Sequence, residues 1–167
     1  MIKLISRSVF FCLSVTLIVG CQTMAKESVC SDYPQPSGFV NDFEMLFSRS
    51  EVKELEGQLL AYEQKTSNEI SVVTTNSYAP DSSMYGFSLQ LAKCWGVGKK
   101  ELNNGIVVVI SKSLREVRIQ NGTGIKEKFT DEEAQSVIDL DMIPMFKKDQ
   151  YYLGVQNALK QIFKELE

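Results

Sequence analysis

Residues Gly105 to Ser111 read GIVVVIS, and this stretch decides the fold. It is continuously apolar and rich in β-branched side chains, which is typical of a central strand covered on both faces. After a short connection, residues 115–120 read REVRIQ and alternate between polar and apolar side chains. The two stretches together predict a β-hairpin in which the first strand is fully buried.

The regions around this hairpin predict one further strand and four helices. Residues 69–75, EISVVTT, are short and β-branched, as expected for a second buried strand. Two capping boxes, Ser48 with Glu51 and Thr130 with Glu133, indicate where helices begin. The expected helices are residues 48–66, 81–95, 130–138 and 151–166, with Pro144 breaking or ending the third of them.

The predicted order is helix, strand, helix, strand, strand, helix, helix. A strand that is buried on both faces requires helices on both sides of its sheet. We therefore expect an α/β protein, a three-layer α/β/α sandwich with a central mixed β-sheet flanked by helices.

The composition excludes several kinds of chemistry. The chain has 167 residues, with 18 Lys and Arg, 21 Asp and Glu, and no histidine. Without histidine there is no Ser-His-Asp triad, no Cys-His pair and no histidine-based zinc site. The net negative charge argues against nucleic acid as a partner, since binding a phosphate backbone requires a concentrated basic face.

The first 20 residues have the pattern of a secretory signal, with Lys3 and Arg7 before an apolar run that is too short to span a bilayer. The following LIVGC, residues 17–21, resembles the bacterial lipobox, in which Cys21 becomes the lipidated first residue. The alternative is an ordinary signal peptide with an incidental cysteine. Gln22, at the position after the cysteine, favours the outer membrane.

We therefore expect a lipoprotein signal peptide over residues 1–20, a lipidated N-terminus and tether over residues 21–37, and one domain over residues 38–167. The mature chain would lose two basic residues and carry a side-chain charge of −5. It would be lipid-anchored in the bacterial cell envelope, at the outer membrane facing the periplasm rather than at the inner membrane.

Cys30 and Cys94 would remain as an even pair in an oxidising compartment. A disulfide between them is one reading. The other is two separate thiols, with Cys94 acting as a small buried hydrophobe beside Trp95. Both readings stay open, because sequence does not show how close the two Cα atoms lie.

Several short motifs occur in a characteristic order. They are GFVND at residues 38–42, WGVG at 95–98, NNG at 103–105, RxxRI at 115–119, GTG at 122–124, TD at 130–131, PMF at 144–146 and YxxG at 151–154. Taken alone, GTG does not predict a dinucleotide site, since no third glycine follows and the next helix opens six residues later. In order, the motifs resemble the TPM domain family, which includes thylakoid-lumen acid phosphatase-like proteins and many bacterial envelope proteins.

The resemblance covers about residues 38–166. It implies an α/β/α sandwich, a divalent-cation site usually discussed with calcium, and the phosphatase activity claimed for some plant members. By position it implies a role for six loop-borne polar residues, Asp42, Asn103, Asn104, Arg115, Arg118 and Asp131. The sequence departs from the family at Lys126, where an acidic residue is common.

Asp42, Asn104 and Asp131 are the predicted metal ligands, because hard cations prefer carboxylate and amide oxygens. If their loops converge at one end of the sheet, they could hold one calcium or magnesium ion. The resemblance to the TPM domain family favours Ca²⁺ over Mg²⁺. Each also has another explanation. Asp42 would bond backbone amides in a turn, Asn104 would belong to a turn, and Asp131 would favour the positive end of a helix.

Asp42, Arg118 and Asp131 are the candidate catalytic residues. In a phosphatase mechanism a metal would polarise a phosphoryl oxygen while an arginine balances the transition-state charge. Arg115 and Arg118 are three positions apart on one predicted strand and would point to opposite faces, and we favour Arg118 for this role.

Two functions are consistent with these features. The first is an envelope lipoprotein that binds a divalent cation and acts as a non-catalytic adaptor for envelope proteins. The alternative is a metal-dependent, acid-phosphatase-like phosphomonoester hydrolase. Turnover that is lost on chelation would separate the hydrolase from the adaptor.

Overall fold

A computed structural model describes residues 29–166, and the compact unit that carries the fold begins at Asp32. The predicted signal peptide and the predicted lipidation site at Cys21 lie outside the described residues. All the helices and strands discussed below belong to the compact unit.

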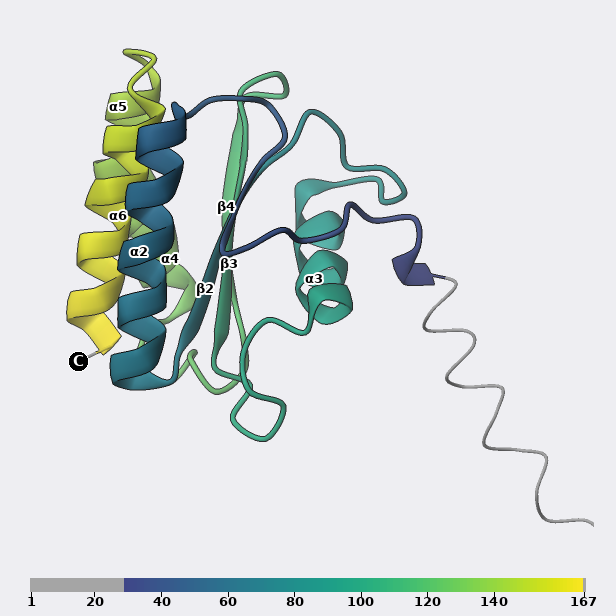
Figure 1. Cartoon of the computed structure of the whole chain (residues 1–167), viewed down its shortest axis with the longest axis vertical. Coiled ribbons are helices and arrows are strands. Elements are labelled where there is room, and N and C mark those ends of the chain that lie inside the picture. The colour runs from purple at the N-terminus through teal and green to yellow at the C-terminus, as the bar shows by residue number, and fades with distance from the viewer. Residues whose placement is uncertain (1–28, 167) are drawn as a thin grey trace, which may run out of the picture. The chain divides into compact units, whose positions relative to one another are not determined.

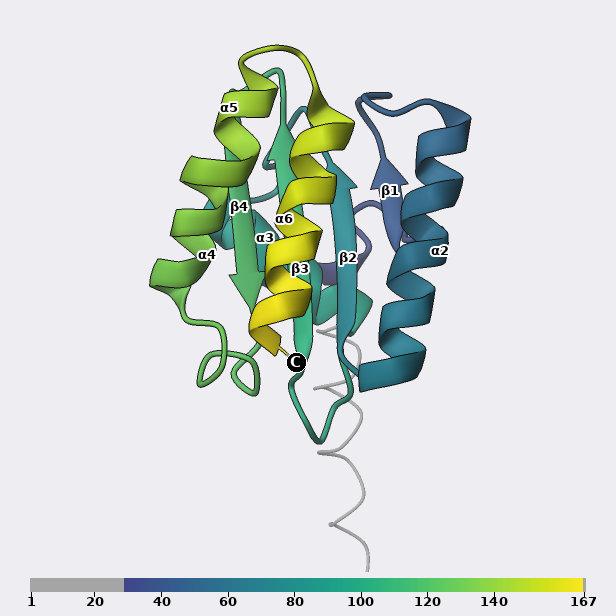
Figure 2. The same cartoon turned by 90° about the vertical axis from the view of Figure 1, so that its left-hand side faces the viewer.

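The centre of the fold is a four-stranded mixed sheet with the order β1-β2-β3-β4 (Figure 2). The strands are β1 (Val40–Asp42), β2 (Glu69–Thr74), β3 (Gly105–Ser111) and β4 (Glu116–Asn121). β1, β2 and β3 run parallel, and β4 pairs antiparallel with β3. The predicted hairpin and the central position of GIVVVIS are therefore confirmed, while β1 is an additional edge strand.

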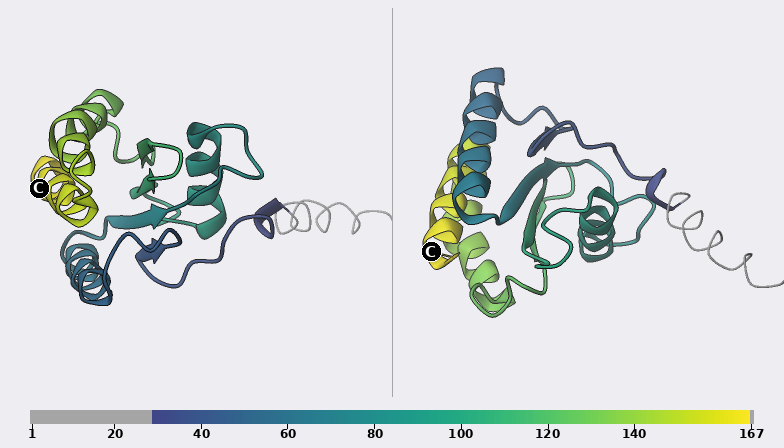
Figure 3. Two further views of the ribbon diagram at one scale, coloured as in Figure 1. Left: turned by 90° about the horizontal axis from the view of Figure 1, so that it is seen from above. Right: turned by 60° about the horizontal axis from the view of Figure 1, so that its bottom comes forward.

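Helices cover both faces of this sheet (Figures 1 and 3). α3 (Met84–Trp95) covers one face. The opposite face carries α2 (Arg49–Thr66), α4 (Asp131–Val137), the π-helical turn η1 (Ile138–Met142), α5 (Ile143–Phe146) and α6 (Tyr151–Leu166). The predicted three-layer α/β/α sandwich is thus confirmed.

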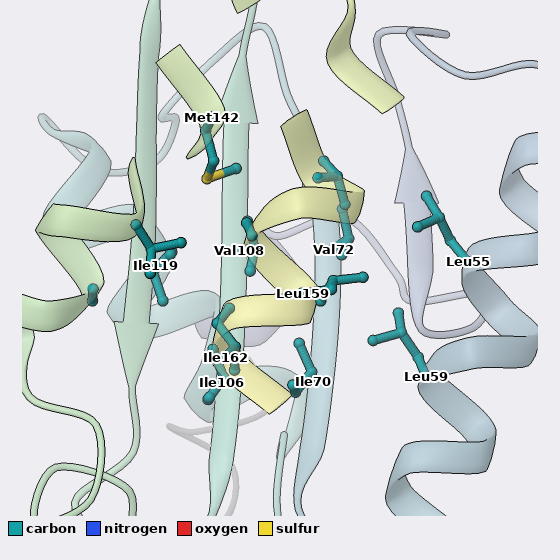
Figure 4. Packing of buried hydrophobic residues seen from close by; sticks show 14 of the residues in the cluster. Leu55, Leu59, Ile70, Val72, Ile106, Val108, Ile119, Met142, Leu159 and Ile162 are labelled. Atoms are coloured by element: carbon teal, nitrogen blue, oxygen red, sulfur yellow. The ribbon is translucent and has the colours of Figure 1, made fainter. Parts of the chain in front are cut away.

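The pleat of β3 explains why its sequence is apolar throughout. Successive side chains of a strand point to opposite faces. Ile106, Val108 and Ile110 pack into the core beneath α2 and α6, whereas Val107 and Val109 pack into the smaller core beneath α3. Figure 4 shows the larger core, with leucine and isoleucine side chains from α2 and α6 filling the space over the sheet.

The helix boundaries mostly follow the predicted caps. Both capping boxes form, at Ser48 before α2 and at Thr130 before α4. α3 begins at Met84 rather than at residue 81, because Ser83 provides its N-terminal cap. Pro144 does not break the third helix. The chain passes through η1 and then places Pro144 in the first turn of α5, where the missing backbone N–H of proline is not needed.

Residues expected in the tether pack against α3. Tyr33 is buried and contacts the ring of Phe87 at a centroid distance of 5.8 Å. The indole N–H of Trp95 donates a hydrogen bond of 2.7 Å to the carbonyl of Pro34. The compact unit, which begins at Asp32, therefore includes residues that precede the family domain expected from residue 38. Cys30 and Cys94 are each disulfide-bonded, and their pairing with one another stays a prediction.

Candidate functional site

Asp42 ends β1 and holds the loop that follows it. Its Oδ1 accepts hydrogen bonds from the backbone N–H of Leu46 (2.9 Å) and the hydroxyl of Thr74 (2.6 Å), and its Oδ2 accepts one from the N–H of Phe47 (2.8 Å). Thr74 is the register partner of Asp42 on β2. The carboxylate therefore fastens the loop between β1 and α2 to the sheet.

Asn104 and Asp131 lie at the other end of the sheet. Asn104 is buried just before β3, where its side chain accepts from the N–H of Lys99 and donates to the carbonyl of Ser67. Asp131 is exposed at the start of α4 and forms an ion pair of 2.6 Å with Lys126. Lys126, the residue that departs from the family pattern, therefore neutralises the predicted acidic ligand.

The three predicted metal ligands do not share one coordination sphere. Asp42 pairs with Thr74, the last residue of β2. Gly105, which directly follows Asn104, pairs with Glu69, the first residue of β2. At about 3.3 Å per residue, the two positions are separated by roughly 17 Å along the sheet. The expectation that these loops converge is wrong. Over residues 29–166 there is also no cluster of three or more Asp, Glu, Cys or His side chains that could hold a metal ion.

The two arginines also lie apart from these residues. Arg118 is on the face of the sheet covered by α3, where its guanidinium stacks over the ring of Tyr85 at 4.6 Å and its Nε donates to Gln120. Arg115 is not on a strand, because it occupies the turn before β4 with a φ of 56°. The catalytic candidates Asp42, Arg118 and Asp131 thus occupy three separate places.

The glycines of the GTG motif serve packing. A Cβ on Gly122 would lie 2.2 Å from the carbonyl oxygen of Asn103, and one on Gly124 would lie 1.9 Å from that of Leu102. The N–H of Gly124 donates a hydrogen bond of 3.0 Å to the Asn103 carbonyl. The absence of side chains at these glycines lets the loop after β4 approach the loop before β3. Asn103 contributes its backbone carbonyl to this contact.

Three loops meet at the carboxyl ends of the parallel strands, at the top of Figure 1. They are residues 43–48, 112–115 and 147–150, and we call them the three-loop end. The Glu44 carboxylate accepts hydrogen bonds from the backbone N–H groups of Lys112 (2.8 Å) and Ser113 (3.0 Å). The ammonium of Lys112 forms a 2.9 Å ion pair with Asp149. These bonds tie each loop to the next.

The three-loop end combines strained backbone with exposed apolar side chains. Each loop contains one non-glycine residue with a positive φ: Met45 (55°), Arg115 (56°) and Asp149 (58°). Such residues are uncommon and often cluster at functional sites. Met45 is 86% exposed, Phe43 is 46% exposed and Leu114 is 37% exposed. Sequence patterns did not indicate this surface, because it depends on contacts between residues nearly 70 positions apart.

A second surface feature is a groove of about 370 Å³ beside α4, η1 and the end of α6. Its apolar lining includes Phe129 and Val137, which are buried, and Leu140, which is 75% exposed. Its charged lining consists of Glu133, Asp141 and Glu165. The segment 131–142 contains five acidic residues and no basic one.

The charge of Asp141 is partly withdrawn from water. Burial raises the pKa of this carboxyl above its ordinary value. A carboxylate with reduced hydration gains more from a nearby cation than a fully hydrated one does. The groove is therefore suited to a ligand that brings positive charge together with apolar surface.

Comparison with known proteins gives a consistent result. The TPM domain family model matches residues 40–165. The chain is similar in structure to the N-terminal domain of a protein from P. gingivalis, determined in solution. The two share 30% sequence identity and a TM-score of 0.69, over 77% of this chain and 81% of that one. No curated protein matches the chain.

Two more distant solution structures have the same fold. The N-terminal domain of a Corynebacterium glutamicum protein is 15% identical, with a TM-score of 0.61, over 81% of this chain and 84% of that one. The BA42 protein of Bizionia argentinensis is 16% identical, with a TM-score of 0.63, over 74% of this chain and 83% of that one.

Among the described residues, no helix has both the length and the hydropathy that a membrane span requires.

Proposed function

The chain belongs to the TPM domain family, and from this premise we propose that it acts as a non-catalytic adaptor that binds another protein of the bacterial cell envelope. The observation that supports this proposal is the groove beside α4, η1 and α6, where the exposed side chain of Leu140 lies beside three carboxylates. The partner would supply an amphipathic helix with apolar residues on one face and Lys or Arg beside them. Amphipathic helices bind apolar grooves in this way in many complexes.

The distribution of polar residues supports a binding role over hydrolysis. A hydrolase needs a nucleophile or activated water, a base and a charge-stabilising group within hydrogen-bonding reach of one substrate. Asp42 and Asn104 have their side chains engaged in internal hydrogen bonds, and Asp131 pairs with Lys126. Because these residues also lie apart, phosphomonoester hydrolysis and a calcium site built from them receive no support.

In this proposal the predicted lipid on Cys21 anchors the chain in the envelope, at the outer membrane facing the periplasm. The lipid places the domain, and the groove selects the protein that is brought to the membrane. The adaptor role therefore requires two separate attachments on one chain.

The groove can be tested in the bacterium that carries this chain. A photo-crosslinking amino acid at Leu140 should couple the protein to one envelope partner, and the same residue at Leu60 on α2 should not. Reversing two groove charges, with Asp141→Lys and Glu165→Lys, should abolish the Leu140 product. The matched control, Glu54→Lys and Glu101→Lys, makes the same change in net charge elsewhere and should leave it intact. Equal loss in both variants, or no discrete product at Leu140, would contradict the proposal.

The hydrolase alternative has its own assay. Purified protein should release no more phosphate from p-nitrophenyl phosphate than an Asp42→Asn variant does, with or without calcium. Turnover that disappears on chelation and in the Asp42→Asn variant would replace the adaptor by a metal-dependent phosphatase.

A further inference from the structure

The three-loop end carries three exposed apolar residues, on two loops that are joined by hydrogen bonds. Glu44 lies between Phe43 and Met45 and is bonded to the turn that carries Leu114. All three apolar side chains are exposed. Exposed apolar side chains that lie together on a surface mark sites of interaction.

The charge of this end is opposite to that of the chain as a whole. The three loops contain four basic residues, Lys112, Arg115, Lys147 and Lys148, and two acidic ones, Glu44 and Asp149. Glu44 is bonded to backbone amides, and Asp149 is paired with Lys112. The three remaining cations are exposed, and none of them forms an ion pair within residues 29–166.

This combination matches an anionic lipid surface better than a protein pocket. Apolar side chains at loop tips can enter the boundary between head groups and acyl chains, while Lys and Arg beside them bind lipid phosphates. The surface is made of turns at the end of the sheet, whereas the groove lies beside α4 and α6. The two surfaces are therefore formed by different residues.

We infer that the three-loop end docks on an anionic membrane surface, with Phe43, Met45 and Leu114 in the head-group region and Arg115, Lys147 and Lys148 on lipid phosphates. This contact is made by the folded domain itself and is separate from the predicted lipid on Cys21.

The test uses the soluble fragment 22–167, which lacks the lipidation site and contains the whole compact unit. A single domain of this kind folds alone, since the P. gingivalis N-terminal domain was determined in solution. The fragment is mixed with vesicles of phosphatidylglycerol and phosphatidylcholine in equal parts, or of phosphatidylcholine alone, and binding is measured by co-sedimentation. We expect binding to the anionic vesicles only, weakened at high salt.

Two variants examine the two halves of the surface. Lys147→Gln with Lys148→Gln should weaken binding about 25-fold, since each cation near an anionic surface contributes about fivefold. Met45→Asn should weaken it at least about fourfold, the effect of one methylene leaving the membrane, and asparagine tolerates the positive φ. The controls at the opposite end, Leu102→Asn and Lys100→Gln with Lys128→Gln, should change binding less than twofold.

Three results would overturn the inference: no binding to anionic vesicles, equal binding to neutral vesicles, or equal losses in the variants and their controls. A fourth is loss of the Leu140 cross-linked partner in the three-loop variants with vesicle binding unchanged, which would make this end a protein interface. The Asp141→Lys, Glu165→Lys variant should leave vesicle binding undiminished. The membrane contact and the proposed adaptor function are therefore tested by separate measurements, and either can be contradicted without the other.

Discussion

The Asp42 carboxylate holds the loop between β1 and α2, because its two oxygens accept hydrogen bonds from two backbone amides and one hydroxyl. A carboxylate placed in this way acts on stability whether or not a metal ion is present. Its partners, Leu46 N–H, Phe47 N–H and the Thr74 hydroxyl, would lose their acceptor together if the side chain were removed.

Asp42→Ala is therefore expected to lower the free energy of unfolding by about 2 to 4 kcal/mol, since hydrogen bonds to charged groups contribute about 1.5 to 3 kcal/mol each and are not additive. Asp131→Ala removes an exposed ion pair and should cost less than about 1 kcal/mol. Urea unfolding with and without calcium measures both. A large gain in the stability of the unmodified protein on adding calcium, absent in Asp42→Ala, would restore Asp42 as a metal ligand.

Asp141 should make stability depend on pH. Burial raises the pKa of this carboxyl, so the folded state binds its proton more tightly than the unfolded chain does. The free energy of unfolding then falls as the pH rises above the ordinary carboxyl pKa of about 3.9. Asp141→Asn removes this cost and should stabilise the protein at neutral pH, within about 0.5 kcal/mol, with no gain near pH 3.

Thermal melts across this pH range check the prediction. Asp139→Asn is the control, since it removes the same charge from a more exposed position on η1. A gain for Asp141→Asn that is no greater than that of the control at neutral pH would mean that relief of repulsion among the acidic side chains, rather than burial, is the cause.

Glycines in this chain have opposite roles in different elements. Gly57 lies in the exposed face of α2, and a Cβ there would meet no atom within 4 Å. Gly124 lies in the loop after β4, and a Cβ there would lie 1.9 Å from a carbonyl oxygen of the loop before β3. Only the second glycine is required by its surroundings.

Gly57→Ala is expected to stabilise the protein by about 0.5 to 1 kcal/mol, the difference in helix propensity between the two residues. Gly124→Ala should destabilise it by about 1 to 3 kcal/mol, since two loops must separate. Chemical denaturation of both variants tests the pair. Equal changes in the free energy of unfolding for the two variants would mean that the close approach of the two loops does not require glycine at position 124.

The sequence was sufficient for elements that carry a long or local signal. Apolar runs predicted β2 and β3, and capping boxes predicted the starts of α2 and α4, because these depend only on neighbouring residues. β1 was missed since three residues are too few for a periodic pattern. The prediction that Pro144 breaks or ends the third helix was wrong. The effect of a proline depends on whether it falls in the first turn of a helix, which composition does not reveal.

The ordered motifs identified the family, but they did not place its residues in space. Which polar residues share an end of the sheet depends on strand direction and register, and these are properties of the whole fold. The same holds for the three-loop end, where Glu44 bonds a turn nearly 70 residues away. The fold was thus predictable to the level of layers, and the candidate site was not.

The Cys30–Cys94 disulfide is a prediction about the molecule as a whole. A bond that closes a loop of about 65 residues should stabilise the folded state by about 3 to 5 kcal/mol. Reduction, or replacement of both cysteines by alanine, should then lower the Tm by about 6 to 20 °C. Peptide mapping without reduction identifies the linked pair, and a product other than Cys30 with Cys94 would contradict the assignment.

The position of GIVVVIS in the sheet has a consequence for association between molecules. A long apolar strand at a sheet edge is a template for strands of neighbouring chains and leads to aggregation. Here that stretch is β3, closed on both sides by β2 and β4. The open edges are β1, which has only three residues, and β4, which carries the charges of Glu116 and Arg118. When molecules crowd at a surface, the sheet edges that meet are therefore poor templates for intermolecular strand pairing. The segment most prone to aggregate, β3, remains paired within the sheet.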